Sequence, residues 1–299
     1  MKVFLSWSPK PPDPPFWKWM PVDGIVVSIA LLKQRKLLKH IILSGIHDFL
    51  DFSGHILLDS GSYEDSITNN KLRPNSPTEL LTLADWLGAD LVAHLDTPFV
   101  GKNAMLLEEE KWNLLKQNIL NAIISYKWAK RKKSKMKVIY VIQGWNHESI
   151  EYCCKELSKL NADYYALGSL VGLHPNEIIS RARLVREIIG DGPKLHLFAV
   201  SNLEVIKKVK SFVDSVDSST ASIAGAMKEI IRPSGRRVHI NKAFKQKCSC
   251  PVCNKHKGAI FVLGKVGTQN YFNQLRKVHN AFQLLRNIRA IIDGENSKH

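Results

Sequence analysis

Short apolar runs and amphipathic stretches alternate along most of the chain. Runs rich in apolar and β-branched residues predict buried strands at residues 24–28, 55–58, 90–95, 137–142, 163–167, 195–200 and 212–216. Between them, helical periodicity predicts helices that include a basic helix ending at Lys39 and residues 76–87, 103–133, 175–189, 202–210 and 271–292. The helix at 76–87 opens on a capping box, Ser76-Pro77-Thr78-Glu79, with proline at its first position.

This alternation indicates a parallel sheet with helical crossovers. Seven or eight strand–helix units in a chain of 299 residues favour an α/β fold of the (β/α)8 TIM-like barrel type. A doubly wound open sheet is the alternative, although no GxGxxG loop follows any predicted strand, which weakens a dinucleotide-binding version of it. We expect residues 1–231 to form the barrel core and residues 232–299 to form a C-terminal appendage packed on it.

The first twenty residues contain five prolines, which predict an irregular segment held down by aromatic side chains. The extreme N-terminus is too short for the apolar region of a signal peptide. The longest apolar run, residues 24–32, falls well short of a membrane span. We therefore expect a soluble, cytoplasmic protein with no membrane partner.

Polar residues stand at the ends of successive predicted strands. They are Asp59, Asp96, Gln143, Ser169 (after Gly168) and Asp217. A single Asp after a strand is commonly a helix cap, but in a barrel all these ends meet at one mouth, where active sites lie. Two carboxylates can break and remake a glycosidic bond, one as nucleophile and one as proton carrier. A third Asp with a Gln amide can bind the edge of a planar heterocycle, and Tyr63 and Phe99 are candidate stacking faces.

Three of the five cysteines, Cys248, Cys250 and Cys253, lie within six residues. Such closely spaced thiolates predict a structural zinc site that lacks one ligand. The fourth ligand is His256 or His279, and we favour His279 because a metal that ties a loop to a helix stabilises more structure. Cys153 and Cys154 are expected to be partly buried side chains in a helix, and free thiols beside a metal site indicate a reducing compartment.

The formal charge is 43 − 27 = +16, which is large for this length. Residues 232–257 contain eight Lys or Arg and no Asp or Glu, so the excess is concentrated in the cysteine-bearing segment. This pattern favours a nucleic-acid partner whose phosphates the segment contacts, although a solvated basic surface is the plainer interpretation.

Several motifs in order resemble those of the tRNA-guanine transglycosylase superfamily, between about residues 24 and 292. They are Asp59-Ser60-Gly61-Ser62-Tyr63, Leu95-Asp96-Thr97-Pro98, Val141-Ile142-Gln143-Gly144, Ala166-Leu167-Gly168-Ser169-Leu170-Val171-Gly172, Val213-Asp214-Ser215-Val216-Asp217-Ser218, and the Cys-x-Cys-x2-Cys loop followed by His279. The resemblance implies a zinc-bearing (β/α)8 barrel that replaces guanine in a nucleic acid with a 7-deazaguanine base. It also supports His279 over His256 as the fourth zinc ligand.

The resemblance further implies a role for each matching residue. Asp217 is the nucleophile that forms a covalent aspartyl–sugar intermediate, and Asp59 is the general acid/base. The base is held by Asp96, Gln143, Gly168, Ser169 and Tyr63. The zinc is structural, and homodimers are usual among similar proteins.

Departures from the family pattern bear on the substrate. Gly172 is followed by Leu173-His174, where bacterial enzymes place an acidic residue, which favours an uncharged base such as preQ0. A compact, basic barrel without the Pro-Thr-Arg that follows the nucleophile in bacterial enzymes is more like the branch that acts on DNA. We narrowly expect DNA as the polymer, with tRNA as the alternative. A non-catalytic accessory subunit of the same fold and a hydrolase of the same bond are the rival functions.

Overall fold

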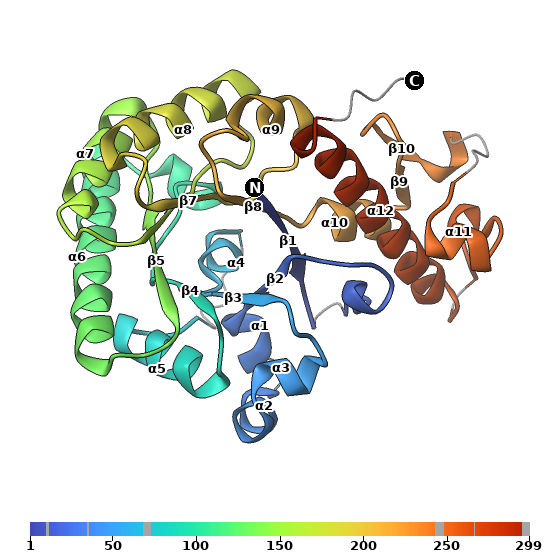
Figure 1. The fold of residues 1–299 in the computed structure, drawn as a ribbon, viewed down its shortest axis with the longest axis horizontal. Helices are drawn as coiled ribbons and strands as arrows, with labels where there is room; N and C mark the ends of the chain where they lie inside the picture. The colour runs from blue at the N-terminus through green and yellow to red at the C-terminus, as the bar shows by residue number, and fades with distance from the viewer. Residues whose placement is uncertain (10–11, 35, 68–72, 243–247, 266, 295–299) are drawn as a thin grey trace.

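The computed structural model describes residues 1–9, 12–34, 36–67, 73–242, 248–265 and 267–294. Eight parallel strands close into a barrel in sequence order, with helices around it (Figure 1). The strands are β1 (Lys2–Trp7), β2 (Gly24–Ser28), β3 (His55–Asp59), β4 (Leu91–Ala93), β5 (Lys137–Ile142), β6 (Tyr164–Leu167), β7 (Lys194–Leu197) and β8 (Ser215–Ser218). The predicted (β/α)8 barrel is therefore confirmed, and the open-sheet alternative is wrong.

The expectation of an irregular N-terminal segment is wrong for residues 2–7. They form β1, which pairs with β2 on one side and with β8 on the other, placing Phe4 opposite Asp217. The prolines begin only at Pro9, so they end the strand without preventing it. The last two strands also differ from prediction, since β7 ends at Leu197 and β8 contains Asp217 within it.

Most predicted helices are present, with changed ends. The helices between strands are α1 (Ile29–Gln34), α2 (Leu38–Ser44), α3 (Ile46–Leu50), α4 (Ser62–Ile67), α5 (Pro77–Leu87), α6 (Glu108–Lys132), α7 (His147–Ser158), α8 (Pro175–Ile189), α9 (Leu203–Val209) and α10 (Thr220–Ala226), and short 3-10 turns occur at η1 (Phe16–Lys18) and η2 (Gly101–Met105). The predicted N-cap is confirmed, because Ser76 Oγ accepts the Glu79 N–H at 3.1 Å, but the Glu79 carboxylate accepts the N–H of Asn75 at 2.8 Å instead of completing a capping box with Ser76. The basic helix predicted up to Lys39 is instead divided between α1 and α2.

The core has two layers, one inside the barrel and one between barrel and helices. Alternate strand positions fill the interior with Phe4, Val26, Leu57, Leu91, Ala93, Ile139, Val141, Tyr164 and Ala166. The outer layer contains Cys153 and Cys154, which are fully buried rather than partly buried as predicted. Burial raises the pKa of both thiols to about 12, so they pack as small apolar groups.

Aspartates brace the end of the barrel opposite the polar strand ends. Each precedes an even-numbered strand, and its carboxylate accepts the N–H of the second residue of a neighbouring odd strand. The pairs are Asp23 with Val3 at 2.9 Å, Asp90 with Ile56 at 2.8 Å and Asp214 with Leu195 at 2.8 Å. Each carboxylate also contacts a basic side chain on the outside of the barrel, respectively Arg289, His47 and Arg186. These contacts fix the register of neighbouring strands. They lie at the N-terminal end of the barrel strands, where no catalytic residue is expected.

The C-terminal segment packs on one side of the barrel. It contains a hairpin of β9 (Glu229–Ile231) and β10 (Arg237–His239), then η3 (Ile240–Lys242), α11 (Pro251–Lys255), η4 (Ala259–Phe261) and the long α12 (Gln269–Ile292). In Figure 1, α12 crosses α10 and runs between the barrel and the hairpin. Lys277 of α12 forms a buried ion pair of 2.8 Å with Asp13 of the β1–β2 loop, which ties the helix to the barrel. No helix among the described residues has the length and apolar character to cross a membrane.

Candidate active site

The five polar residues predicted at strand ends gather at one mouth of the barrel. Three of them form a hydrogen-bonded chain. Ser169 Oγ donates to Gln143 Oε1 at 2.5 Å, and Gln143 Nε2 donates to Asp96 Oδ2 at 2.5 Å. The Phe99 N–H donates to Ser169 Oγ at 2.8 Å, so Ser169 joins the loop after β4 to Gln143. An ionised Asp96 only accepts, which is consistent with the Nε2 end of the Gln143 amide facing it and the Oε1 end facing the Ser169 hydroxyl.

The loop after β6 is shaped to fit this chain. A Cβ on Gly168 would lie 2.4 Å from Gln143 Nε2, so only glycine leaves room for the amide. Ser169 follows in a left-handed conformation with φ of 55°, which costs backbone energy. That conformation places the Ser169 hydroxyl between the Phe99 amide and Gln143.

Two residues outside the loop after β4 hold the segment around Asp96 from two sides. Arg73 donates from Nη1 to the Asp96 carbonyl oxygen at 2.9 Å, while its Nε pairs with Asp65 at 3.0 Å. On the other side, Asn118 of α6 brackets Thr97 by accepting its N–H and donating to its carbonyl oxygen, both at 2.9 Å. Burial raises the pKa of the Asp96 carboxyl above its ordinary value.

Asp59 stands at the end of β3, where the DSG sequence turns sharply. Its Oδ2 accepts the Gly61 N–H at 3.0 Å, and Gly61 has a φ of 89°, which favours glycine. Burial raises the pKa of Asp59 well above its ordinary value, and the charges of Glu64 and Asp96 raise it further. Glu64, in the first turn of α4, also has a raised pKa through burial. The mouth therefore favours a protonated carboxyl at Asp59.

Asp217 has a different environment. Its Oδ1 accepts the Ala199 N–H at 2.8 Å and contacts His196 Nε2 at 3.3 Å, and its Oδ2 accepts the Ser6 hydroxyl at 3.0 Å. Ala199 has a φ of 59°, an unusual value for a residue with a Cβ, and this conformation aims its N–H at the carboxylate. Asp217 is thus an acceptor surrounded by donors, whereas Asp59 lies among other acids. This contrast suits a pair in which one carboxyl donates a proton and the other attacks.

The two candidate stacking residues are placed differently. Tyr63 is 42% exposed on α4, next to the mouth. Phe99 is only 5% exposed, and its ring packs against Trp145 with centroids 4.8 Å apart, so it does not present an open face. Sequence reasoning missed Ser6, Arg73, His196 and Ala199. For His196 a signal existed, since it is a polar residue within an apolar run at 195–200.

The three loop cysteines and one histidine form a cluster. The Nδ1 atom of His279 lies 3.6, 3.4 and 3.5 Å from the sulfurs of Cys248, Cys250 and Cys253. A tetrahedral site with bonds of about 2.3 Å to sulfur and about 2.1 Å to nitrogen has N···S edges of about 3.6 Å. His279 Nε2 lies 3.2 Å from the Ile231 carbonyl oxygen, to which it donates, leaving the Nδ1 lone pair for a metal. The four ligand atoms lie within 4.8 Å of one another, which matches the predicted set with His279.

The predicted phosphate-binding segment at residues 232–257 is only partly described. Lys245 and Lys247 lie outside the described residues. Arg237 pairs with Glu229 across the hairpin, with its Nε 2.8 Å from Oε2. Its charge is therefore balanced within the protein.

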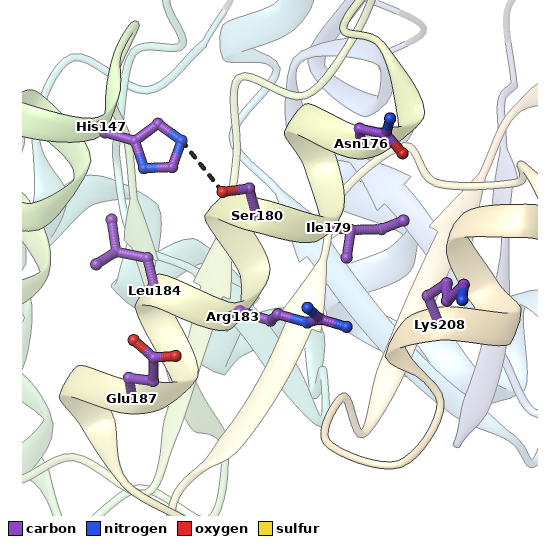
Figure 2. Close-up of a pocket in the computed structure, with 8 residues that line it drawn as sticks. All are labelled: His147, Asn176, Ile179, Ser180, Arg183, Leu184, Glu187 and Lys208. Carbon is purple, nitrogen blue, oxygen red and sulfur yellow. Dashed lines mark hydrogen bonds between the residues drawn. The ribbon is translucent and has the colours of Figure 1, made fainter.

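A groove with a volume of about 550 Å3 lies on the outer surface, along α8. Figure 2 shows His147 of α7 directed at Ser180, 3.4 Å away, with Arg183 and Lys208 on the other side. None of the predicted site residues lines this groove. The candidate chemistry therefore lies at the barrel mouth and not in this groove.

Comparison with known proteins identifies similar sequences. Residues 22–297 match the sequence model of the family described as queuine tRNA-ribosyltransferase. The chain is 26% identical over 281 residues to a tRNA-guanine(15) transglycosylase of Methanosphaera stadtmanae, covering 91% of this chain and 40% of that protein. A protein of the same description from Korarchaeum cryptofilum is 25% identical, covering 79% of this chain and 40% of that protein. Another from Nanoarchaeum equitans is 27% identical, covering 72% of this chain and 51% of that protein. The chain thus spans about half the length, or less, of these relatives.

Proposed function

This chain belongs to the queuine tRNA-ribosyltransferase family, and on that premise we propose that it is a pentosyltransferase that exchanges guanine in a nucleic acid for another base. The observation that carries the proposal is the arrangement at the mouth. A base-sized hydrogen-bonding chain of Asp96, Gln143 and Ser169 lies beside two carboxyls in contrasting environments, Asp59 and Asp217.

We propose tRNA as the polymer. The relatives named above are described as acting on tRNA, which supports the alternative in our sequence analysis better than the preference for DNA. DNA remains a prediction that the assay below decides. The target nucleoside leaves its stack and enters the mouth, at a cost of a few kcal/mol.

In the proposed reaction, Asp217 attacks the sugar C1′ and the bond from C1′ to the base nitrogen breaks. The departing guanine takes the bonding electrons and receives a proton from Asp59. The incoming base then loses its proton to the Asp59 carboxylate, and its nitrogen displaces Asp217 from C1′. One glycosidic bond replaces another, so the exchange needs no external energy source.

Base recognition is assigned to the hydrogen-bonding chain. Guanine and 7-deazaguanine offer N–H donors on their Watson–Crick edge, which a carboxylate can accept, and a carbonyl oxygen, which an amide can approach. Asp96 and Gln143 supply these two groups, and the backbone at Gly168 and Ser169 adjoins Gln143. We assign one face of the base to Tyr63, whose side chain is exposed on α4. Leu173-His174 after the base loop favours an uncharged 7-deazaguanine such as preQ0 as the incoming base.

We assign the ion held by Cys248, Cys250, Cys253 and His279 as zinc. Three thiolates and one imidazole at tetrahedral spacing are a common structural zinc set, and four protein ligands leave no position for substrate. Gln283 Nε2 lies 3.0 Å from the sulfur of Cys248, and this donor supports a charged thiolate. The metal joins the loop, α11, α12 and β9 into one unit.

The test is an exchange assay with guanine-labelled tRNA or duplex DNA, incubated with unlabelled preQ0 and then digested for nucleoside mass spectrometry. Loss of the guanine label from tRNA alone, with 7-deazaguanosine appearing in its digest, supports the proposal. The same products in DNA alone would replace tRNA by DNA and keep the mechanism. Abasic sites would identify a hydrolase. Binding without exchange would favour an accessory subunit, whose activity appears only with a second chain.

A further inference from the structure

A column of buried polar groups runs down the barrel axis beneath Asp217. The Tyr164 hydroxyl on β6 lies 2.7 Å from Ser215 Oγ on β8, and Ser215 Oγ lies 2.9 Å from His196 Nδ1 on β7. His196 Nε2 lies 3.3 Å from Asp217 Oδ1. All four side chains are at least nine-tenths buried, so they are removed from bulk solvent and bond to one another. None of the three groups below Asp217 has a part in the chemistry proposed above.

The donors in this column can be assigned from their chemistry. An ionised Asp217 only accepts, so His196 Nε2 must carry the proton that it donates. A neutral imidazole then has a bare Nδ1, which accepts from the Ser215 hydroxyl. Because the single hydroxyl proton of Ser215 is donated to His196, the hydroxyl of Tyr164 must donate to Ser215. Burial raises the pKa of Tyr164, so its hydroxyl keeps this proton.

We propose that His196, as a neutral imidazole protonated on Nε2, is the positioning residue that orients Asp217 for attack, and that Ser215 and Tyr164 set its tautomer. The inference rests on the proposed function, because it gives Asp217 the role of nucleophile. His196 does not touch the base or the sugar in this assignment. It acts only by orienting Asp217, in the same way that a hydrogen-bond partner orients a metal-ligating side chain.

The surroundings of His196 support a neutral ring. The rings of Phe4 and Phe198 pack on it, with centroids 6.0 and 4.6 Å away. Its Nε2 contacts the Asp217 carboxyl at 3.3 Å. Apolar walls of this kind disfavour a buried cation and keep the ring plane fixed. With the ring fixed, Asp217 Oδ1 is held between His196 and the Ala199 amide, and Ser6 holds Oδ2.

A histidine can also be buried for packing alone, and His94 offers the comparison. It is fully buried, its Nδ1 accepts the Val141 N–H at 3.0 Å, and its Nε2 lies 3.3 Å from the Asn118 carbonyl oxygen. It thus shares the expected tautomer, but both of its ring nitrogens contact backbone atoms rather than a carboxylate. Its signals give an internal reference that variants of the column should leave unchanged.

The deciding experiment combines 15N NMR of the imidazoles with single-turnover formation of the covalent adduct. We expect His196 to show the Nε2–H tautomer at neutral pH. Ser215→Ala should move the His196 Nδ1 resonance and leave His94 unchanged. His196→Phe, which keeps bulk and loses the donor, should slow adduct formation about 10²-fold with nucleic-acid Kd unchanged, the usual scale for one lost electrostatic donor. His196→Gln, which restores an N–H donor, should recover part of the rate.

An imidazolium or an Nδ1–H tautomer in the wild-type protein would overturn the inference, as would a His196→Phe variant that forms adduct at the wild-type rate. A wild-type protein that exchanges no base in any polymer would instead defeat the proposed function. In that case the tautomer measurement still decides the column by itself, so the two failures are distinguishable.

Discussion

A Cβ on Gly168 would lie 2.4 Å from Nε2 and 2.6 Å from Oε1 of Gln143, so the amide occupies the space that any other side chain would need. The glycine after β6 therefore makes room for Gln143, the residue that follows β5. Gln143 in turn spans from Ser169 to Asp96. The proposed base-binding edge thus depends on the absence of a side chain at position 168.

Gly168→Ala should weaken base binding while the fold survives. The clash is with the end of a flexible side chain, so Gln143 can swing away and lose its bond to Asp96. We expect the Kd for the free base to rise about 10- to 100-fold, as for the loss of one or two polar contacts. Titration calorimetry measures it. Gly192→Ala, where a Cβ meets nothing within 4 Å, is the control and should bind normally.

Asp217→Ala and Asp217→Asn should abolish the covalent adduct while tRNA binding persists. Neither side chain supplies a carboxylate to attack C1′. The asparagine variant keeps the shape of the site, so it separates nucleophilicity from packing. Denaturing gel electrophoresis detects the adduct, and filter binding measures affinity. An adduct that persists in both variants would remove Asp217 from its assigned role.

The acid cluster should make stability fall as pH rises. The ordinary pKa of Asp59 is 3.8, and in the fold burial and neighbouring acids raise it well above that value. A group with a raised folded pKa stabilises the protein fully below its unfolded pKa and loses that contribution as pH rises through the folded pKa. Asp59→Asn replaces the carboxyl with an amide that does not ionise, so the variant should not lose this stability as pH rises. We expect the variant to exceed wild type in free energy of unfolding at pH 8, by about 0.5–2 kcal/mol.

Urea unfolding at pH 4 and pH 8 provides the test of this pH dependence. The difference between Asp59→Asn and wild type should shrink toward pH 4, because the wild-type carboxyl is then protonated in the folded state and close to half protonated in the unfolded state, where its pKa is 3.8. Exchange activity should be lost in the variant at either pH. An equal difference at both pH values would contradict the assigned protonation of Asp59.

Removing the metal should loosen the C-terminal unit and lower the melting temperature. The ligands connect the cysteine loop to His279 on α12, which packs along α10. We expect one zinc ion per chain by elemental analysis, and its loss with a strong chelator or in Cys253→Ser. Cys154→Ala, a buried cysteine outside the cluster, should retain the metal. Full metal content in Cys253→Ser would argue against the assigned ligand set.

Asp90→Asn should destabilise the barrel without changing the chemistry. The Asp90 carboxylate accepts the Ile56 N–H at 2.8 Å and pairs with His47 at 3.1 Å, at the end opposite the site. Loss of a charged acceptor for a backbone donor costs about 1–3 kcal/mol. Denaturant unfolding should show this loss, while turnover per folded molecule stays the same. Asp191→Asn, in the exposed α8–β7 loop, is the matched control and should leave stability unchanged.

The sequence by itself determined the repeating elements and most of the candidate site. Alternating strand and helix patterns are local, and a strand followed by a helix places its terminal residue at the barrel mouth. Asp59, Asp96 and Gln143 were therefore predictable from position, and Cys248, Cys250 and Cys253 from spacing. His279 was chosen between two histidines, and the geometry agrees with that choice.

Only the tertiary structure decided which distant residues share a hydrogen bond. β1 was missed because its strand character depends on pairing with β2 and β8, and its Ser6 reaches Asp217 across 211 residues. The column of Tyr164, Ser215 and His196 likewise joins three strands whose register is set when the barrel closes. A local sequence pattern indicates which face of a strand is buried. It does not indicate hydrogen-bond partners, because hydrogen bonds require a short distance and a particular direction between two groups. Their partners are therefore fixed only when the barrel closes and sets the strand register.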